Sequence, residues 1–289
     1  MIDVFLAPIK LIVGTGIGRI PIVAKIYQTV IPRLLTKKEK IISFDSFKIL
    51  VITGRRISNV ATGLLFKHQY EPATTGVFKR LLSPGDRVID VGANIGYFSL
   101  LASSIVGGSG HVDAFEPDFS NTQALQQNID LNGFKNIHIH QVAVSDKVGK
   151  AVFHTSIEDS GHSLVKTKEH SSSTMTNTDK LDNMVYGDVR LLKTDTEGNE
   201  LSVLKGAEKV IRRSNKICLI MEVFFDVMDA GGYTIDELWD YLISVGMKFF
   251  YIINDRKETV TRCYSAQDVS DICKNHCLYI NLLCMKEEM

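Results

Sequence analysis

The segment from Arg87 to Ala102 constrains the fold of this chain more than any other part of its sequence. An apolar run suited to a β-strand ends in Asp90, and a turn of small residues leads into a second apolar run that suits a helix. This order of strand, glycine turn and helix opens a nucleotide-binding α/β unit. Position 97, where the dinucleotide pattern has its third glycine, holds a tyrosine, and a carboxylate in the turn favours a ligand with a cationic group over a pyrophosphate. The turn residues are Gly92, Asn94 and Gly96.

A second acid lies about twenty residues after the turn. The stretch from His111 to Phe115 suits a strand and is followed by Glu116, which is placed to accept both ribose hydroxyls of an adenosine. A later alternating stretch runs into Ala143 and Asp146, where a loop would meet the adenine ring. A cationic amino acid end and an adenosine together describe S-adenosylmethionine (SAM). The sequence therefore predicts that cofactor.

Three further acids follow buried-type strands nearer the C-terminus. One predicted strand ends in Asp195 and Glu197, and the next predicted strand ends in Glu222. Because ligands in open α/β sheets bind beyond the carboxyl ends of the strands, we expect these acids on the same rim as the glycine turn. They would repel one another unless they hold a proton, a cation or a donor-rich substrate. A helix is predicted from Glu200 to Arg213, and Glu200 is interpreted as capping and charging its N-terminus.

Composition excludes some classes of protein. Lysines and arginines number 33 and so do aspartates and glutamates, so there is no global electrostatic case for nucleic acid. A hydrophobic content of 45% supports a sizeable core. The odd number of cysteines, five, and the lack of a clear secretory signal favour reduced thiols in the cytoplasm.

Residues 1–40 are predicted to form a basic amphipathic segment, with no apolar stretch near the roughly twenty residues that a bilayer crossing needs. One interpretation is that the segment packs on the domain or on a second subunit. The other is a peripheral contact with the inner face of the membrane. A hairpin is predicted at residues 41–56. The polar stretch from Glu158 to Asn177 is predicted to be a surface loop of the kind that covers binding sites.

The motifs together resemble the FkbM family of SAM-dependent methyltransferases, from about Tyr70 to Tyr251. They read Val-Ile-Asp-Val-Gly-Ala-Asn-Ile-Gly, Phe-Glu-Pro, Ala-Val-Ser-Asp and Lys-Thr-Asp-Thr-Glu-Gly-Asn-Glu, the last followed by Val-Leu-Lys-Gly-Ala. The resemblance implies a Rossmann-like class I methyltransferase fold, with a seven-stranded, mostly parallel sheet and helices on both faces. It implies a single domain over residues 41–289, with its core from about residue 70, after an N-terminal helical and hairpin appendage.

The resemblance also implies roles for individual residues. The cofactor would be lined by Asp90, Gly92, Asn94, Gly96 and Glu116, and Glu71 lies in a segment that usually precedes the cofactor domain. The acids at 195, 197 and 222 match acidic positions of the family. The implied reaction is O-methylation of a hydroxyl on a sugar, a glycan or a related small molecule.

A sugar hydroxyl needs help to lose its proton, and several groups are candidates for that task. Asp195 is the preferred general base, ahead of Glu197, and His162 in the polar insert is a rival. A divalent cation held by Asp195, Glu197 and Glu222 is an alternative way to activate the hydroxyl.

Two other functions stay open on the sequence. One is a non-catalytic SAM-binding or scaffold protein, and the other is a methyltransferase for a lipid or protein acceptor. A base-modifying enzyme is disfavoured, because the strand that carries Asp195 lacks an Asn-Pro-Pro-aromatic motif.

Overall fold

The computed structural model describes residues 38–53, 64–65, 69–156, 162–167, 170–276 and 279–288. The basic segment predicted at residues 1–40 lies outside the described residues except for its last three. The chain divides into two compact units, one with residues 1–42, 50–70 and 158–160, and one with residues 43–49, 71–157 and 161–289. Strands β1 (Lys38–Ser43) and β2 (Lys48–Thr53) form a two-stranded sheet in the region predicted to be a hairpin. In the described part of the chain, no helix has both the length and the apolar character needed to cross a membrane.

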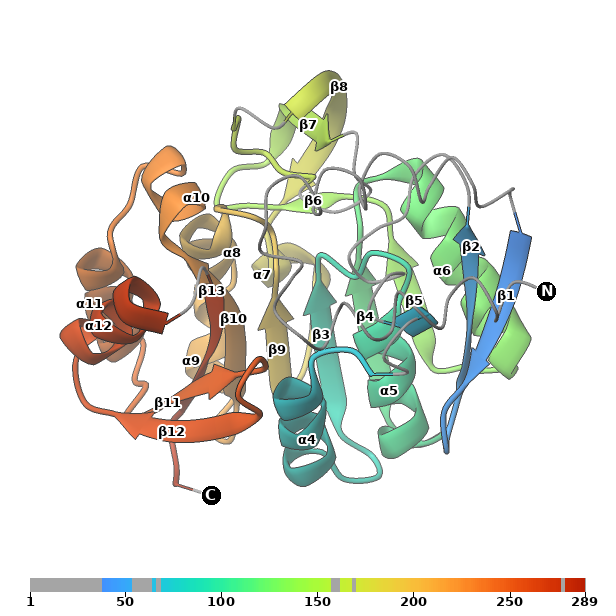
Figure 1. The fold of residues 1–289 in the computed structure, drawn as a ribbon, viewed down its shortest axis with the longest axis horizontal. Helices are drawn as coiled ribbons and strands as arrows, with labels where there is room; N and C mark the ends of the chain where they lie inside the picture. Colours follow the sequence, from blue (N-terminus) through green and yellow to red (C-terminus); the bar gives the residue numbers. More distant parts are fainter. Residues whose placement is uncertain are drawn as a thin grey trace, which may run out of the picture. The chain divides into compact units, whose positions relative to one another are not determined.

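The second unit is built on a large sheet whose strand order is β12-β11-β13-β10-β9-β3-β4-β5 (Figure 1). The neighbours from β10 to β5 pair in parallel, whereas β13 is antiparallel to both of its neighbours. The bounds are β3 (Arg87–Val91), β4 (His111–Phe115), β5 (Ile137–His140), β9 (Leu191–Thr194), β10 (Cys218–Phe224), β11 (Phe249–Asn254), β12 (Thr259–Cys263) and β13 (Tyr279–Met285). The predicted mostly parallel fold is confirmed. Among the described residues the sheet has eight strands rather than seven, because the chain turns back after β11 and adds β12 at the edge.

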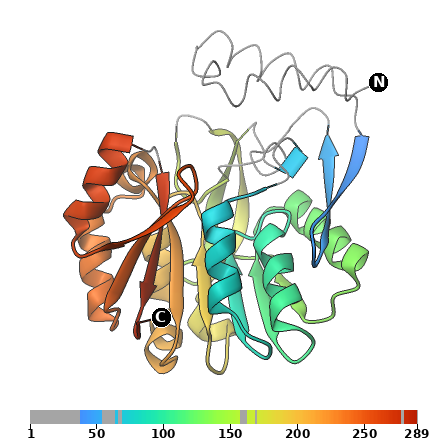
Figure 2. The same cartoon turned by 60° about the horizontal axis from the view of Figure 1, so that its bottom comes forward.

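Helices cover both faces of this sheet, as predicted. Helices α4 and α5 lie over one face, and α8 and α9 lie over the other (Figures 1 and 2). The predicted helix over residues 200–213 is two short helices that meet at Ala207. The helices are α4 (Pro72–Leu81), α5 (Tyr97–Val106), α6 (Phe119–Asn132), α7 (Leu181–Met184), α8 (Glu200–Gly206), α9 (Glu208–Arg213), α10 (Phe225–Ala230), α11 (Ile235–Ser244) and α12 (Ala266–His276).

The alternation of strand side chains explains how polar groups come to lie inside this fold. Ile89 and Leu192 belong to the main apolar core with residues of α8, α9 and α11. Because successive side chains of a strand point to opposite faces, Asp90 and Lys193 turn the other way, toward α5. These two residues are direct partners in the parallel pairing of β3 with β9. A carboxylate and an ammonium group are thus buried next to each other, near the carboxyl ends of β3 and β9 and on the face toward α5.

The polar insert is more ordered than predicted. Strands β6 (Ala143–Val144), β7 (Gly149–Ser156) and β8 (His170–Asp179) form a separate sheet in the order β6-β8-β7, which projects beyond the ends of the parallel strands (Figure 1). The prediction of a loop from Glu158 to Asn177 is therefore wrong for residues 170–177. Serine and threonine suggested a loop, but threonine suits a strand, and β8 pairs with β7 along most of its length.

Candidate cofactor and catalytic site

Asp90 provides the first feature of the site. It lies next to the carboxyl end of β3 and is only 1% exposed. One carboxylate oxygen, Oδ2, accepts a hydrogen bond from Ser99 Oγ at 2.6 Å, while the buried Oδ1 has no hydrogen-bond partner among the described residues. Burial raises the pKa of Asp90, and the positive charge of Lys193 opposes that rise. A buried carboxylate oxygen without a donor is a suitable acceptor for a cationic ligand group.

Glu116 stands directly after β4 and is also buried. Its Oε2 accepts the backbone N–H of Asn94 at 2.8 Å, and its Oε1 accepts that of Asp118 at 2.9 Å. Burial raises the pKa of Glu116 to about 7. The Asn121 side chain is a third donor to this carboxylate. Since a carboxylate offers about four lone-pair sites, Glu116 can still accept another hydrogen bond. Asn94 contributes its backbone to this contact, because its own Oδ1 accepts the N–H of Ile95.

The glycines of the turn permit close packing within the protein. A side chain at Gly92, where φ is +81°, would place its Cβ 1.9 Å from the carbonyl oxygen of Asp195. At Gly96, where φ is +98°, the Cβ would lie 2.3 Å from a methyl carbon of Leu125 in α6. At position 92 the close approach brings the turn against the loop that carries Asp195 and Glu197. Contact of these glycines with the cofactor stays a prediction.

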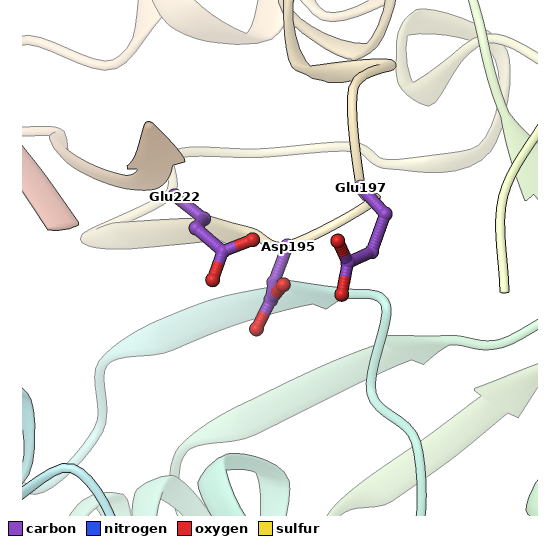
Figure 3. Close-up of side chains that lie close together, drawn as sticks. All are labelled: Asp195, Glu197 and Glu222. Carbon is purple, nitrogen blue, oxygen red and sulfur yellow. The ribbon is translucent and has the colours of Figure 1, made fainter. Parts of the chain in front are cut away.

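Asp195, Glu197 and Glu222 come together as predicted. Their carboxylates point to the same side, with Asp195 between the other two (Figure 3). One oxygen of each residue lies within 4.8 Å of the others, a spacing that would also suit a divalent cation. Burial, together with the charges of Asp195 and Glu197, raises the pKa of Glu222 well above its ordinary value. Glu222 precedes the end of β10 by two residues, so the prediction that it ends its strand is wrong.

Lys193 is part of this site but was not singled out from the sequence. It is 2% exposed, and its Nζ lies 2.9 Å from Asp195 Oδ2 and 4.8 Å from the centre of the Phe98 ring. Burial alone would lower its pKa, but the carboxylates of Asp195, Glu71 and Asp90 outweigh burial and raise it. The signal in the sequence was a lysine within an otherwise apolar strand, because a buried charge needs a partner.

The loop between β9 and α8 is fixed from two sides. Glu197 has a left-handed backbone, with φ of +54°, which is unfavourable for a residue with a side chain. The buried Glu200 carboxylate accepts hydrogen bonds from the N–H groups of Thr196 and Gly198. It also accepts one from the Tyr233 hydroxyl, whose oxygen lies 2.7 Å from Glu200 Oε2. On the other side, Ser163 Oγ lies 2.9 and 2.8 Å from the carbonyl oxygens of residues 196 and 197 and donates to them. Glu200 thus holds the loop, a larger role than the predicted cap.

The comparisons with known proteins bear on this geometry. Residues 90–249 match the model of the methyltransferase FkbM domain. The chain belongs to the FkbM methyltransferase family. The predictions of the family, the fold class and the cofactor SAM are thereby confirmed. A search of the curated proteins finds no match to this FkbM-family chain.

Solved structures of methyltransferases also resemble this FkbM-family chain, at low sequence identity. A methyltransferase FkbM from Methylobacillus flagellatus KT is 17% identical; the match covers 80% of this chain and 56% of that one, with a TM-score of 0.46. A SAM-dependent O-methyltransferase from Thermotoga maritima is 13% identical, over 86% of this chain and 78% of that one, with a TM-score of 0.45. A SAM-dependent methyltransferase from Aquifex aeolicus is 14% identical, over 76% of this chain and 100% of that one, with a TM-score of 0.41.

The two acids on the first strands of this FkbM-family chain fit SAM. The unpartnered Oδ1 of Asp90 suits the amino group of the ligand, and the two oxygens of Glu116 suit the ribose hydroxyls. Glu71, which was predicted to bind the cofactor, accepts a hydrogen bond from Asn281 Nδ2 at 3.1 Å. Its charge also raises the pKa of Glu222, so Glu71 lies toward the catalytic acids.

The remaining predicted residues of the FkbM-family site lie on the insert. Ala143 is in β6, and the backbone of Ser145 and Asp146 lies against Gly206 in α8, where a Cβ on the glycine would be 2.2 Å from the carbonyl oxygen of residue 145. A contact of Asp146 with the cofactor stays a prediction. His162 lies with its Nδ1 3.8 Å from Asp118 Oδ2, on the Glu116 side of the site.

Proposed function

We propose that this FkbM-family enzyme transfers the methyl group of SAM to a hydroxyl of a sugar, a glycan or a related small molecule. The observation that carries the proposal is the cluster of Asp195, Glu197 and Glu222, whose carboxylates converge beside the cofactor turn. SAM supplies an electrophilic methyl group on its sulfonium. The enzyme has to align the acceptor oxygen and take its proton.

Asp195 is the proposed general base. The proton of the acceptor hydroxyl leaves as the new bond forms, and a fixed carboxylate within reach is suited to accept it. Asp195 is held by the 2.9 Å contact with Lys193, and it stands between the other two acids (Figure 3). Glu222, with its raised pKa, is suited to hold a proton beside it. Glu197 completes the cluster and orients the acceptor.

The charge of the site supports an acceptor that is rich in hydroxyl groups. The carboxylates of Asp195, Glu71 and Asp90 lie around the ammonium group of Lys193, and Glu197 and Glu222 add two further carboxylates beside Asp195. Such a site repels phosphates and carboxylates, whereas hydroxyl groups can donate hydrogen bonds to its oxygens. This argument favours sugars over nucleic acids and over acidic lipids as acceptors.

The decisive experiment is an assay of S-adenosylhomocysteine (SAH) release from SAM with a panel of acceptors. The panel contains neutral glycans, phosphorylated sugars, a phospholipid vesicle and an RNA mixture, each matched for concentration. We expect turnover with neutral glycans and methylation at oxygen in the mass spectrum of the product. Turnover with only the phospholipid or only the RNA mixture would overturn the proposed acceptor class. Tight SAH binding without turnover on any acceptor would favour the scaffold alternative.

A further inference from the structure

His162 is a buried polar side chain whose ring makes no hydrogen bond within the described part of the chain. It belongs to residues 162–167, which are the described part of the connection between β7 and β8, and its side chain is 10% exposed. Both ring nitrogens lack a hydrogen-bond partner among those residues, and the ring packs edge-on against Phe153. Buried polar atoms of native proteins are nearly always hydrogen-bonded, so an imidazole with both nitrogens unsatisfied needs an explanation.

The surroundings place this ring next to the adenosine half of the cofactor site. Its Nδ1 lies 3.8 Å from Asp118 Oδ2, and the N–H of Asp118 donates to Glu116 at 2.9 Å. Asp118 therefore contacts both the His162 ring and the Glu116 carboxylate, which is the carboxylate that fits the ribose. The catalytic acids lie on the other side of Ser163, whose Oγ donates to the carbonyl oxygens of residues 196 and 197.

The backbone of Ser163, the residue after His162, is hydrogen-bonded to β7. The N–H of Ser163 donates to the carbonyl of His154 at 3.0 Å, and the N–H of His154 donates back at 2.8 Å. These two bonds tie the segment to β7, and the Ser163 hydroxyl ties it to the acid loop. The segment lies across the rim, from the ribose-binding end to the catalytic end.

We propose that His162 is a cofactor-binding residue, whose imidazole makes hydrogen bonds to the adenosine part of SAM and covers it from the insert. A neutral imidazole has one donor and one acceptor nitrogen, and the hydroxyls and ring nitrogens of an adenosine can satisfy both. The inference rests on the same site as the proposed function, but it does not depend on which acceptor is methylated. It separates His162 from the role of general base.

The test is calorimetry of two ligands with His162→Ala. SAH contains both halves of the cofactor product, and 5′-methylthioadenosine contains the adenosine half without the amino acid. A lost neutral hydrogen bond corresponds to a roughly three- to tenfold weaker affinity, and we expect this loss for both ligands. The matched control is His154→Ala on the same insert, whose ring packs against His170 and whose loss should leave both affinities unchanged.

Two results would overturn the inference. Unchanged affinity of His162→Ala for both ligands, with slower turnover on a working acceptor, would indicate that His162 acts in catalysis. Weaker affinity for SAH alone would indicate that His162 contacts the amino acid end of the ligand. A failure to find any methylated acceptor leaves these binding results untouched, so the two proposals fail separately.

A second measurement covers the case in which the alanine variant does not fold. The ring nitrogens of the wild-type histidines are observed by NMR, and the His162 signals are identified by their loss in His162→Gln. Saturation with SAH should shift both His162 nitrogen signals and leave those of His154 in place. Unshifted His162 signals at saturation would refute the contact.

Discussion

Lys193 is buried among acids, and its removal should be costly for that reason. Without the ammonium group, Asp195 and Asp90 lose the cation that compensates their buried charge. Breaking a buried ion pair on one side typically lowers the free energy of unfolding by about 3–5 kcal/mol. We expect a loss of this size for Lys193→Met in urea denaturation. The double variant Lys193→Met with Asp195→Asn should lose less, because one unpaired charge is gone. Asp195→Asn alone completes the comparison, and a double-variant loss equal to the sum of the two single losses would show that the pair is not coupled.

Glu116 should make cofactor binding depend on pH. Its pKa of about 7 lies above the ordinary 4.5 because the carboxyl is buried. The ionised form is the better acceptor for ribose hydroxyls, so the affinity for SAH should rise as the pH increases through 7. Calorimetry at pH 6 and pH 8, in buffers with different ionisation enthalpies, should show proton release on binding at the lower pH. The dependence should disappear in Glu116→Gln. The free energy of unfolding changes in the opposite direction. The folded protein without ligand favours the protonated acid, so it loses this contribution to its stability as the pH rises from 4.5 to 7.

The three catalytic acids should separate binding from turnover. Asp195→Asn should leave SAH affinity nearly intact and slow methyl transfer by about 10²–10⁴-fold, the usual scale for the loss of a general base. Glu197→Gln should slow methyl transfer by a smaller factor than Asp195→Asn if Asp195 is the base. The matched control is Glu208→Gln in α9, whose exposed carboxylate pairs with Arg212. Loss of turnover in a chelator, with rescue by Mg²⁺ or Mn²⁺, would instead show that the cluster acts through a cation.

Some of these residues could be recognised from the sequence and others could not. Asp90, Glu116, Asp195 and Glu222 lie within two residues of the carboxyl ends of apolar strands, and parallel strands end on one rim, so their convergence was predictable. The role of Glu200 was not, because it depends on Tyr233, a residue 33 positions later in the chain. An acid in the first turn of a helix usually interacts with the helix dipole, and the sequence alone contained no sign of a second donor.

At the scale of elements, the loop before α8 holds Glu197 in a conformation that it would not adopt alone. Glu200→Gln replaces one acceptor oxygen by a donor, and a buried N–H of Thr196 or Gly198 then lacks a partner. We expect the free energy of unfolding to fall by about 1–3 kcal/mol and turnover to fall with it, while SAH affinity is retained. Tyr233→Phe removes only one donor from the same carboxylate and should keep most of the turnover. Equal turnover in wild type and Glu200→Gln would mean that turnover does not depend on the hydrogen bonds between Glu200 and the loop.

The elements also show where patterns in the sequence mislead. The strand–turn–helix unit at residues 87–106 was predictable, because its apolar strand, glycine turn and helix are consecutive. Strand β8 was missed, because its serine and threonine side chains resemble a loop in composition. The break at Ala207 was missed as well, since the apolar spacing continues through it.

At the scale of the whole molecule, a neutral chain concentrates acids at one site and bases in its first forty residues. If residues 1–40 contact a membrane, the full-length protein should co-sediment with anionic vesicles and be released by salt, because surface attraction is screened within about 10 Å at 0.1 M. A chain that starts at Ile41 should stay in solution. Equal sedimentation of both proteins would favour the packing interpretation.

The sequence predicts more about the fold of the whole molecule than about its acceptor. The fold depends on the order of apolar strands and on two motifs, which are local in the sequence. The insert and the N-terminal segment, where we expect the acceptor to be selected, contain no motif. Long-range pairing of the insert and the placement of its His162 beside Asp118 are set by tertiary contacts.

The contact between Gly92 and the carbonyl of Asp195 has a consequence for anyone who wishes to retarget this enzyme. Even one added methyl group at position 92 would displace the backbone of the acid loop, so a change made to tune cofactor affinity would also alter the chemistry at the acceptor. The two halves of the reaction are not independent modules. Directed evolution toward new acceptors should therefore leave the turn unchanged and place its diversity in β7 and β8 of the insert, where Val152 and Met175 are already exposed to solvent.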